Sequence, residues 1–300
     1  LKIYKSESLG IVGETGSGKS TLGRCMIRLI EPDTGAVYFD DRELLKLPKK
    51  QFRHLRKKFQ MIYQSPGQSL NPLQTVKSCI SEPLRVEEKL EDEQLESMLK
   101  ELLHSVGLEE EHLKRFPHQL SGGQKQKVVI ARALASNPVF IVADEPTSSL
   151  DSEAKKQILD LLIKIKNRLS ITVLMISHDI SVIGYATDRV AVMLNGRIVE
   201  LGPTKEILND PLHPYTKQLI RIARQNGLSN NSKTTEEHPY SEKASACTYG
   251  DQCTVANQQC ADIMPELIEV AEGRFVTCHH QKSSEIPIKE YDISKLNVAI

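Results

Sequence analysis

The sequence contains no tryptophan, only 5% aromatic residues and no excess of either charge, with 39 basic and 39 acidic side chains. Without net charge, the chain has no overall field that would attract nucleic acid or an anionic membrane. No apolar run approaches the roughly 18 residues that cross a bilayer, and the first residues lack the basic-then-apolar layout of a secretion signal. The chain begins at Leu1 rather than at a methionine. We therefore expect a cytoplasmic globular protein whose natural N-terminus precedes Leu1.

Cysteine is scarce along most of the chain and concentrated near its end. Two of the six cysteines, Cys25 and Cys79, stand alone, and the other four lie in the last fifth: Cys247, Cys253, Cys260 and Cys278. This clustering predicts a small cysteine-rich C-terminal module over residues 246–300. The polar residues 226–245 before it are typical of a linker.

The apolar pattern of the rest predicts strands that alternate with helices. A short strand, a glycine turn and a helix come first, and that helix places Leu22, Met26, Leu29 and Ile30 on one face. Two nearly continuous apolar runs, "VFIVAD" and "ITVLMIS", are typical of a parallel sheet covered on both faces. Further strands are predicted over residues 36–40 and 59–63, and helices over 48–58, 95–106 and 158–165. The order indicates a doubly wound α/β core.

The segment "GETGSGKS", residues 13–20, satisfies the GxxxxGK[ST] phosphate loop. Its backbone N–H groups can surround a β-phosphate, the Lys19 amine can reach the β- and γ-oxygens, and the Ser20 hydroxyl can bind Mg²⁺. The alternative is a glycine-rich structural turn. The expected nucleotide-binding residues here are Gly13, Gly16, Ser17, Gly18, Lys19, Ser20 and Thr21.

Two acidic residues follow the apolar run "VFIVAD". Asp144 ends the predicted strand and can hold Mg²⁺ through water, and Glu145 can polarise the water that attacks the γ-phosphate. The alternative is that both residues only cap the next helix.

A second glycine pair occurs in "HQLSGGQKQK", residues 118–127. Ser121 is predicted at a helix N-terminus, where the backbone amides of Gly122 and Gly123 would create an anion site at the positive end of the helix dipole. The alternative is an ordinary N-capped helix.

With these motifs, residues 1 to about 225 resemble the ATP-binding-cassette (ABC) ATPases. The resemblance implies a RecA-like parallel-sheet core, a helical subdomain over about 70–135 and an N-terminal antiparallel part that is truncated. In that family two cassettes pair head to tail around ATP and Mg²⁺. The signature of one cassette, which matches Ser121, Gly122, Gly123 and Gln124 here, then closes on the ATP held by the other.

Further positions match the family one by one. Gln64 resembles the glutamine that touches Mg²⁺ or the attacking water, Asp151 lies in a segment resembling the D-loop, and His178 resembles the histidine that contacts the γ-phosphate. Glu145 as base with His178 as its partner is the implied mechanism. Two departures stand out. Lys125 and Lys127 replace the usual arginines, and no aromatic residue lies far enough upstream of the loop to stack on adenine.

The segments "SPGQSLNP" and "PLHPYTKQLI", residues 65–72 and 211–220, resemble the oligopeptide and dipeptide permease branch, which includes nickel importers. The resemblance implies a similar second ATPase subunit, two transmembrane permease subunits and an extracytoplasmic peptide-binding protein as partners. It places the chain at the cytoplasmic face of the membrane. The expected function is to power peptide import. The alternatives are import of nickel or another small solute, and a soluble ABC ATPase acting on nucleic acid.

The four tail cysteines have the spacing Cys-x₅-Cys-x₆-Cys-x₁₇-Cys. This pattern resembles the C-terminal region of the same branch, where a [4Fe–4S] cluster can be bound. Four thiolates suit an iron–sulfur cluster or zinc, and a segment without metal is the third alternative. The basic residues 48–58 could bind nucleic acid, although such a run is more often a solvated helix face, and we expect no nucleic-acid partner.

Overall fold

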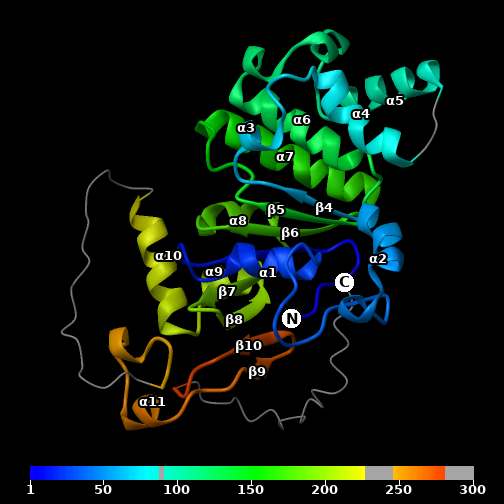
Figure 1. The fold of residues 1–300 in the computed structure, drawn as a ribbon. Helices are drawn as coiled ribbons and strands as arrows, with labels where there is room; N and C mark the ends of the chain where they lie inside the picture. Colours follow the sequence, from blue (N-terminus) through cyan, green and yellow to red (C-terminus); the bar gives the residue numbers. More distant parts are fainter. Residues whose placement is uncertain (88–90, 227–245, 281–300) are drawn as a thin grey trace. The chain divides into compact units, whose positions relative to one another are not determined.

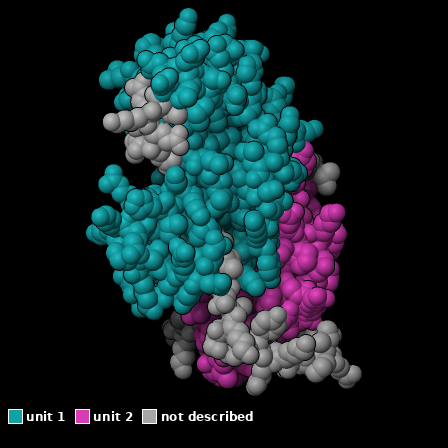
Figure 2. All heavy atoms as spheres, turned by 90° about the vertical axis from the view of Figure 1, so that its right-hand side faces the viewer, with its two compact units in different colours: residues 1–8, 23–176, 296–300 teal, residues 9–22, 177–295 magenta. Residues whose placement is uncertain are grey.

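The computed structural model describes residues 1–87, 91–226 and 246–280. They form two compact units, which Figure 2 distinguishes by colour. Unit 1 comprises Leu1–Ser8 and Gly23–Ile176, and unit 2 comprises Leu9–Leu22 and the described residues from Ser177 onward. The predicted linker lies outside the described residues from residue 227 on, as do the last twenty residues of the predicted module, 281–300.

Unit 1 combines three parallel strands with a group of helices (Figure 1). Its strands are β2 (Tyr38–Phe39), β3 (Arg42–Glu43), β4 (Phe59–Ile62), β5 (Phe140–Asp144) and most of β6 (Thr172–Ser177). Its helices are the end of α1 (Lys19–Met26), then α2 (Lys49–Leu55), α3 (Pro66–Ser69), α4 (Val76–Glu87), α5 (Asp92–Ser105), α6 (Gly122–Leu134) and α7 (Ser152–Leu169). Short 3₁₀ turns are η1 (Leu44–Lys46), η2 (Arg56–Lys58), η3 (Glu110–Lys114) and η4 (Pro117–Gln119).

The central strand β5 pairs in parallel with β4 on one side and β6 on the other. The register joins Ile62 to Ala143 and Asp144 to Ile176. Every residue of β5 and β6 is buried. This burial confirms that the two apolar runs are covered on both faces, as parallel strands require.

Helix α6 is the most enclosed helix of unit 1 and contacts α3, α4, α5 and α7 (Figure 1). It is buried on more than one side, from Val128 to Ala131 without a break. Helix α5 instead buries one stripe, Leu95, Leu99 and Leu103, whose spacing of four places them on a single face. The predicted helix over 95–106 is therefore confirmed, and its stripe packs against α4 and α6.

The helix after the phosphate loop ends earlier than predicted, at Met26. Arg28 adopts a positive φ of 51°, the Arg28 N–H donates to Cys25 O, and the Leu29 N–H donates to Arg24 O. These two bonds form a Schellman cap, which stops the helix. Leu29 and Ile30 are consequently 36% and 40% exposed, so the prediction that they extend its apolar face was wrong.

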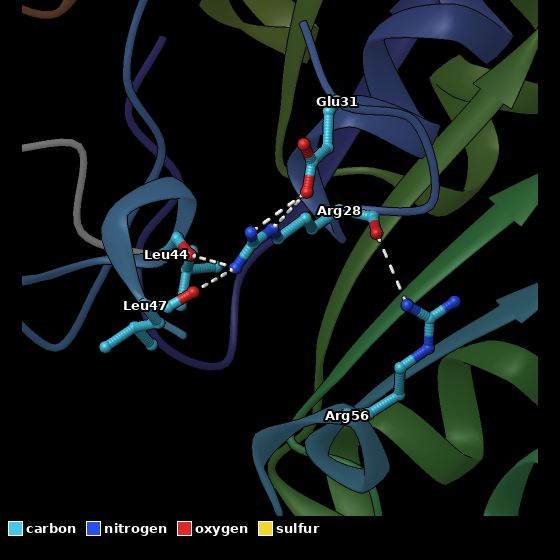
Figure 3. A network of polar contacts seen from close by, with 5 residues as sticks. All are labelled: Arg28, Glu31, Leu44, Leu47 and Arg56. Carbon is cyan, nitrogen blue, oxygen red and sulfur yellow. Dashed lines mark hydrogen bonds and ion pairs between the residues drawn. The ribbon is translucent and has the colours of Figure 1, made fainter. Parts of the chain in front are cut away.

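The Arg28 side chain joins this helix end to the following turn (Figure 3). Its Nη1 donates to the carbonyl oxygens of Leu44 and Leu47, both at 2.8 Å, while Nη2 pairs with Glu31 at 2.9 Å. The Arg56 side chain donates to the Arg28 carbonyl at 3.3 Å. Arg28 thereby fixes the route of the chain from α1 to η1.

The strand predicted over 36–40 is only the first half of a short hairpin, β2 and β3. Asp40 and Asp41 connect the two strands with φ of 46° and 61°. Positive φ at both central residues is the conformation of a tight two-residue hairpin turn, and aspartate tolerates it better than most residues.

Unit 2 pairs β1 (Ser8–Val12) in parallel with β7 (Arg189–Leu194), which then pairs antiparallel with β8 (Arg197–Pro203). Strand β10 (Arg274–Val276) lies antiparallel to β8 and also pairs with β9 (Ile268–Ala271). The helices are the start of α1, α8 (Ile180–Ala186), α9 (Thr204–Asn209), α10 (Pro214–Asn226) and α11 (Gln258–Asp262), with the 3₁₀ turn η5 (Gly250–Gln252).

The cysteine-bearing tail is part of unit 2 rather than a separate module. Phe275 and Val276 of β10 pair with Leu201 and Glu200 of β8, so the tail extends the strands of the unit. The Arg274 guanidinium lies 3.6 Å from the Glu200 carboxylate, and the Glu200 side chain is fully buried. The expectation of an independent cysteine-rich module is corrected by this pairing.

None of the helices in the described part of the chain is both long enough and apolar enough to span a bilayer.

Candidate nucleotide site

The phosphate loop connects β1 to α1 within unit 2. Gly13 passes so close to β7 that an added Cβ would lie 2.0 Å from the Met193 carbonyl oxygen. Gly18 has φ of 95°, a conformation that only glycine adopts readily. The Gly196 N–H donates to Ser17 O at 3.0 Å and holds the loop from outside. The backbone path of the loop thus requires glycine at positions 13 and 18. The same path leaves the backbone N–H groups at the start of α1 available to bind an anion.

Lys19 is 6% exposed and its amine is held at the loop itself. The Nζ atom donates to the Gly13 carbonyl at 2.8 Å and to the Glu14 carbonyl at 2.6 Å. Ser20 and Thr21 follow in the first turn of α1. This geometry places an ammonium group and the helix N-terminus around one loop, which is the arrangement that binds phosphate.

The acidic pair and Gln64 lie at one edge of unit 1. Asp144 ends β5 and is 4% exposed, and Gln64 follows β4, which pairs with β5 in parallel. Because the carboxyl ends of parallel strands share an edge, Gln64 lies at the same edge as Asp144 and Glu145. Oxygen donors of this kind suit Mg²⁺.

Glu145 has an unusual backbone, with φ of 52°, and its N–H donates to the Ile176 carbonyl at 2.9 Å. A left-handed conformation costs a non-glycine residue about 1 kcal/mol, so the surrounding structure must hold it. Helix α7 begins only at Ser152, and its N-cap is Asp151. The alternative that Asp144 and Glu145 cap the next helix is therefore wrong.

Two charged residues near the acidic pair have structural partners. The Arg24 guanidinium of α1 lies 3.9 Å from the Asp144 carboxylate. The Asp151 carboxylate accepts from the N–H groups of Glu153 and Ala154 at 3.1 and 2.9 Å. Asp151 thus caps α7 within this chain, whatever else it contacts. His178 directly follows β6, has an exposed side chain and belongs to unit 2.

The signature segment forms a capping box at the start of α6. The Ser121 hydroxyl accepts from the Gln124 N–H at 3.2 Å, and the Gln124 side-chain oxygen accepts from the Ser121 N–H at 3.0 Å. An N-cap hydroxyl that accepts one hydrogen bond still has its own proton to donate. Because Gly122 and Gly123 occupy the first helical positions, their N–H groups have no partner within the helix. The cap and the anion site are therefore compatible, not alternatives.

A groove of about 1190 Å³ lies on unit 1. One of its lining residues, Tyr63, directly precedes Gln64 in the sequence. Three of its lining residues are the basic Arg53, Arg56 and Lys57. Arg132 of α6, another lining residue, donates to Ser69 O at 2.7 Å and pairs with Glu82 of α4 at 2.8 Å. These bonds connect α6 to the segments that form the groove.

A buried polar cluster lies where α10 begins in unit 2. The Glu200 carboxylate accepts from the N–H groups of Leu212 and His213 at 2.9 and 3.0 Å. His213 Nδ1 accepts from the Tyr215 N–H at 3.1 Å. Burial lowers the pKa of His213 to about 4, opposed only in part by its hydrogen bond with the Thr277 backbone. The imidazole is therefore neutral at pH 7.

Tyr215 contacts the phosphate loop, although no sequence motif indicated it as a site residue. Its hydroxyl accepts a hydrogen bond from the Glu14 N–H at 3.1 Å, across a separation of 201 residues. Burial raises the pKa of Tyr215 to about 12. The motif "HPYT" was visible in the sequence, but nothing in its spacing indicates a contact with the phosphate loop.

The four tail cysteines gather in one region of unit 2. The Cys247 N–H donates to Cys260 O at 2.9 Å, and Cys260 Sγ lies 3.7 Å from His280 Nε2. Burial, with a smaller contribution from the neighbouring thiolates, raises the pKa of Cys253 and of Cys278. The donor chemistry fits a thiolate metal site. The side-chain positions do not, because no three His, Cys, Asp or Glu side chains among residues 1–87, 91–226 and 246–280 form a group that could hold a metal ion.

Comparison with known proteins adds the family. The model of the ABC transporter family matches residues 1–148, and the model of the oligopeptide/dipeptide transporter C-terminal region matches residues 199–260. The oligopeptide transport ATP-binding protein AppF of Bacillus subtilis is 39% identical over 286 residues, which cover 93% of this chain and 87% of that protein. The dipeptide transport ATP-binding protein DppF of Haemophilus influenzae is 35% identical over 284 residues, covering 93% and 87%.

Solved structures agree on the fold. The ATP-binding cassette MJ0796, in a dimeric post-hydrolysis state bound to ADP and Pi, is 34% identical to this chain with a TM-score of 0.62. The similarity covers 68% of this chain and 88% of that one. CbiO1 from Clostridium perfringens, part of the transporter complex cbiONQ, has a TM-score of 0.64 at 30% identity, covering 76% and 90%.

We predict that Lys19→Ala weakens ATP binding by about 10- to 100-fold, because a charge-assisted hydrogen bond to phosphate contributes roughly 1.5–3 kcal/mol. The dissociation constant from titration calorimetry measures the loss. Lys5→Ala, which removes an exposed lysine of unit 1, is the matched control and should bind ATP like the wild type. Equal affinities for Lys19→Ala and the wild type would contradict the site.

We also predict that His213 makes stability fall as the pH is lowered. The folded state keeps the imidazole neutral down to about pH 4, whereas the unfolded chain takes up a proton near pH 6.5, so folding opposes protonation between these values. Between pH 7 and pH 5 this costs about 2 kcal/mol of unfolding free energy. Urea unfolding of the wild type and of His213→Asn at both pH values should show a smaller pH-dependent loss in the variant. His54→Asn, an exposed histidine, should behave as the wild type.

Proposed function

This chain belongs to the ABC transporter family, and we propose that it is the ATP-binding and ATP-hydrolysing subunit of an importer of oligopeptides or dipeptides. One observation carries the proposal: a phosphate loop with a buried lysine occurs in the same chain as a region matching the oligopeptide/dipeptide transporter C-terminal model. Two of its relatives are an oligopeptide and a dipeptide transport ATP-binding protein, and this similarity supports peptides as the cargo.

The proposed chemistry is hydrolysis of the γ-phosphate by an in-line water. In this mechanism Lys19 and the backbone amides of the loop bind the phosphates. Glu145 accepts the proton of the attacking water, with His178 as its partner. Ser20, Gln64 and Asp144 would hold Mg²⁺, which neutralises charge on the phosphate oxygens when bound. The positive φ of Glu145 supports its role, because strained backbone often accompanies catalytic residues.

A second cassette is proposed to complete the site. Ser121, Gly122 and Gly123 present a hydroxyl proton and two helix-terminal N–H groups, which suit the γ-phosphate of a nucleotide bound elsewhere. One chain therefore carries two half-sites, and two chains of this type, identical or related, would enclose two ATP molecules.

We propose that the groove on unit 1 receives a segment of a transmembrane permease subunit. Its lining residue Tyr63 directly precedes Gln64 in the sequence. The same short segment would therefore contact both the nucleotide and the permease. Arg53, Arg56 and Lys57 of the predicted basic run are among the groove's lining residues, and we propose that this run contacts the permease rather than nucleic acid. The protein would then lie at the cytoplasmic face of the membrane, with a peptide-binding protein on the other side.

We further propose that the four tail cysteines bind a metal, with a [4Fe–4S] cluster favoured over zinc. The proposal is supported by the gathering of four cysteines in one region, where burial and, to a smaller extent, the neighbouring cysteines raise the pKa of Cys253 and of Cys278. The described side chains do not form a group that could hold a metal ion. Binding would therefore require the four thiols to move closer together and to lose their protons.

To test transport, the chain is reconstituted with its companion ATPase, permease and binding protein in vesicles. We expect ATP-dependent uptake of a labelled oligopeptide, and we expect Glu145→Gln to lower ATP turnover more than 100-fold while ATP still binds, since only the base is lost. Glu101→Gln, an exposed glutamate of α5, is the matched control. Uptake of nickel but no peptide would disprove the cargo, and full turnover by Glu145→Gln would disprove the base.

To test the cysteines, the full chain is purified without oxygen and its iron, sulfide and zinc are measured together with its visible absorbance. We expect about four irons per chain and a broad absorbance near 400 nm, both lost in Cys253→Ser. Cys79→Ser, outside the tail, should keep both. Bound zinc without iron, or no metal at all, would contradict the cluster.

A further inference from the structure

The phosphate loop is contacted from outside by the segment "HPYT", residues 213–216, in unit 2. The Tyr215 hydroxyl accepts the Glu14 N–H at 3.1 Å, and the tyrosine is only 2% exposed. Glu14 is the second residue of the loop and its side chain is exposed, so the contact acts on the backbone of the loop.

The carbonyl group of Glu14 holds the amine of Lys19. The Glu14 carbonyl accepts from Lys19 Nζ at 2.6 Å and from the Ser17 N–H at 3.2 Å. Glu14 is therefore fixed at its N–H by Tyr215 and at its carbonyl by the lysine. A rotation of this residue would displace the carbonyl that positions the Lys19 amine.

Tyr215 is in turn held by the cysteine-bearing tail. The Tyr249 ring lies 5.6 Å from the Tyr215 ring at an interplanar angle of 59° and 5.8 Å from the His213 ring. The Tyr249 hydroxyl donates to the Gln218 side chain of α10, and Tyr249 is 6% exposed. Tilted aromatic pairs at this distance add about 0.5–1.5 kcal/mol beyond burial of their surface.

Tyr249 is positioned by the turn that carries the first two tail cysteines. The Gly250 N–H donates to Cys247 O at 2.9 Å, and the Cys253 N–H donates to Gly250 O at 3.2 Å. A change in the conformation of this turn therefore moves the ring that packs on Tyr215.

We infer that Tyr215 is a positioning residue of the nucleotide site and that Tyr249 connects the cysteine-bearing turn to it. The inference rests on the proposed binding of ATP at the phosphate loop. It assigns a role to the "HPYT" segment: the tyrosine holds Glu14, Glu14 holds Lys19, and the tail holds the tyrosine. These contacts between residues do not depend on a bound metal.

The central test is Tyr215→Phe in the full chain, which keeps the ring and its packing on Tyr249 but removes the acceptor of the Glu14 N–H. We expect the dissociation constant for ATP to rise about fivefold, the effect of losing one hydrogen bond. In the reconstituted complex the KM for ATP should rise by a similar factor, with kcat changed less than about twofold. Tyr185→Phe, an exposed tyrosine of α8, is the matched control and should leave both values unchanged.

A double-mutant cycle tests the connection to the tail. Tyr249→Ala should weaken ATP binding in the presence of Tyr215 and add little to Tyr215→Phe, because both changes act through the same hydrogen bond. Tyr249→Phe, which keeps the ring, should bind ATP nearly as the wild type does. Additive effects of the two substitutions would overturn the connection.

Hydrogen exchange provides a readout that does not depend on a variant folding well. In the wild type the Glu14 amide should be protected from exchange without nucleotide, and Tyr249→Ala should speed its exchange in the loop while β7 stays protected. An unprotected Glu14 amide, or an unchanged ATP affinity for Tyr215→Phe, would overturn the inference. A wild-type chain that fails to bind ATP would instead disprove the proposed function.

Discussion

The backbone of residues 13–18 must keep one conformation, and the nucleotide site depends on this constraint. Phosphate is bound mainly by N–H groups, which have no flexible side chain with which to correct a misplaced backbone. The structure fixes this backbone from several directions: the Met193 carbonyl lies against Gly13, the Gly196 N–H holds Ser17, and the Tyr215 hydroxyl accepts the Glu14 N–H. The Lys19 amine then depends on carbonyls of the same loop. A site assembled in this way is sensitive to residues that never touch the nucleotide.

Two left-handed residues, Arg28 and Glu145, lie where the chain turns sharply, and both are held by hydrogen bonds. Arg28 ends α1 in a Schellman cap and its side chain bonds the Leu44 and Leu47 carbonyls, so the residue that carries the strain also makes the stabilising contacts. Glu145 turns the chain out of β5 and is held through its N–H by β6. The strain at Arg28 determines the path of the chain, whereas the strain at Glu145 sets the direction of a residue we propose as the base.

The C-terminal part of the chain connects the fold of unit 2 to its proposed activity. Fully buried Glu200 joins β8 to the start of α10 through two N–H groups and to β10 through Arg274. Such a buried carboxylate is tolerated because each of these groups compensates its desolvation. The same cluster places Tyr215 against the loop. The region that matches the oligopeptide/dipeptide transporter C-terminal model therefore also contacts the phosphate loop.

The sequence by itself determined the phosphate loop, the acidic pair after a buried strand, the capped glycine pair and the family, because these depend on residue type and short spacing along one element. It also predicted the parallel strands β5 and β6, because nearly continuous apolar runs of this length are typical of strands buried on both faces. Tertiary structure alone decided the early end of α1, the cap formed by Asp151, the pairing of the tail with β8 and the contact of Tyr215 with Glu14. Each of these joins groups far apart in sequence or selects between conformations of similar local energy, and local patterns carry no information about such partners.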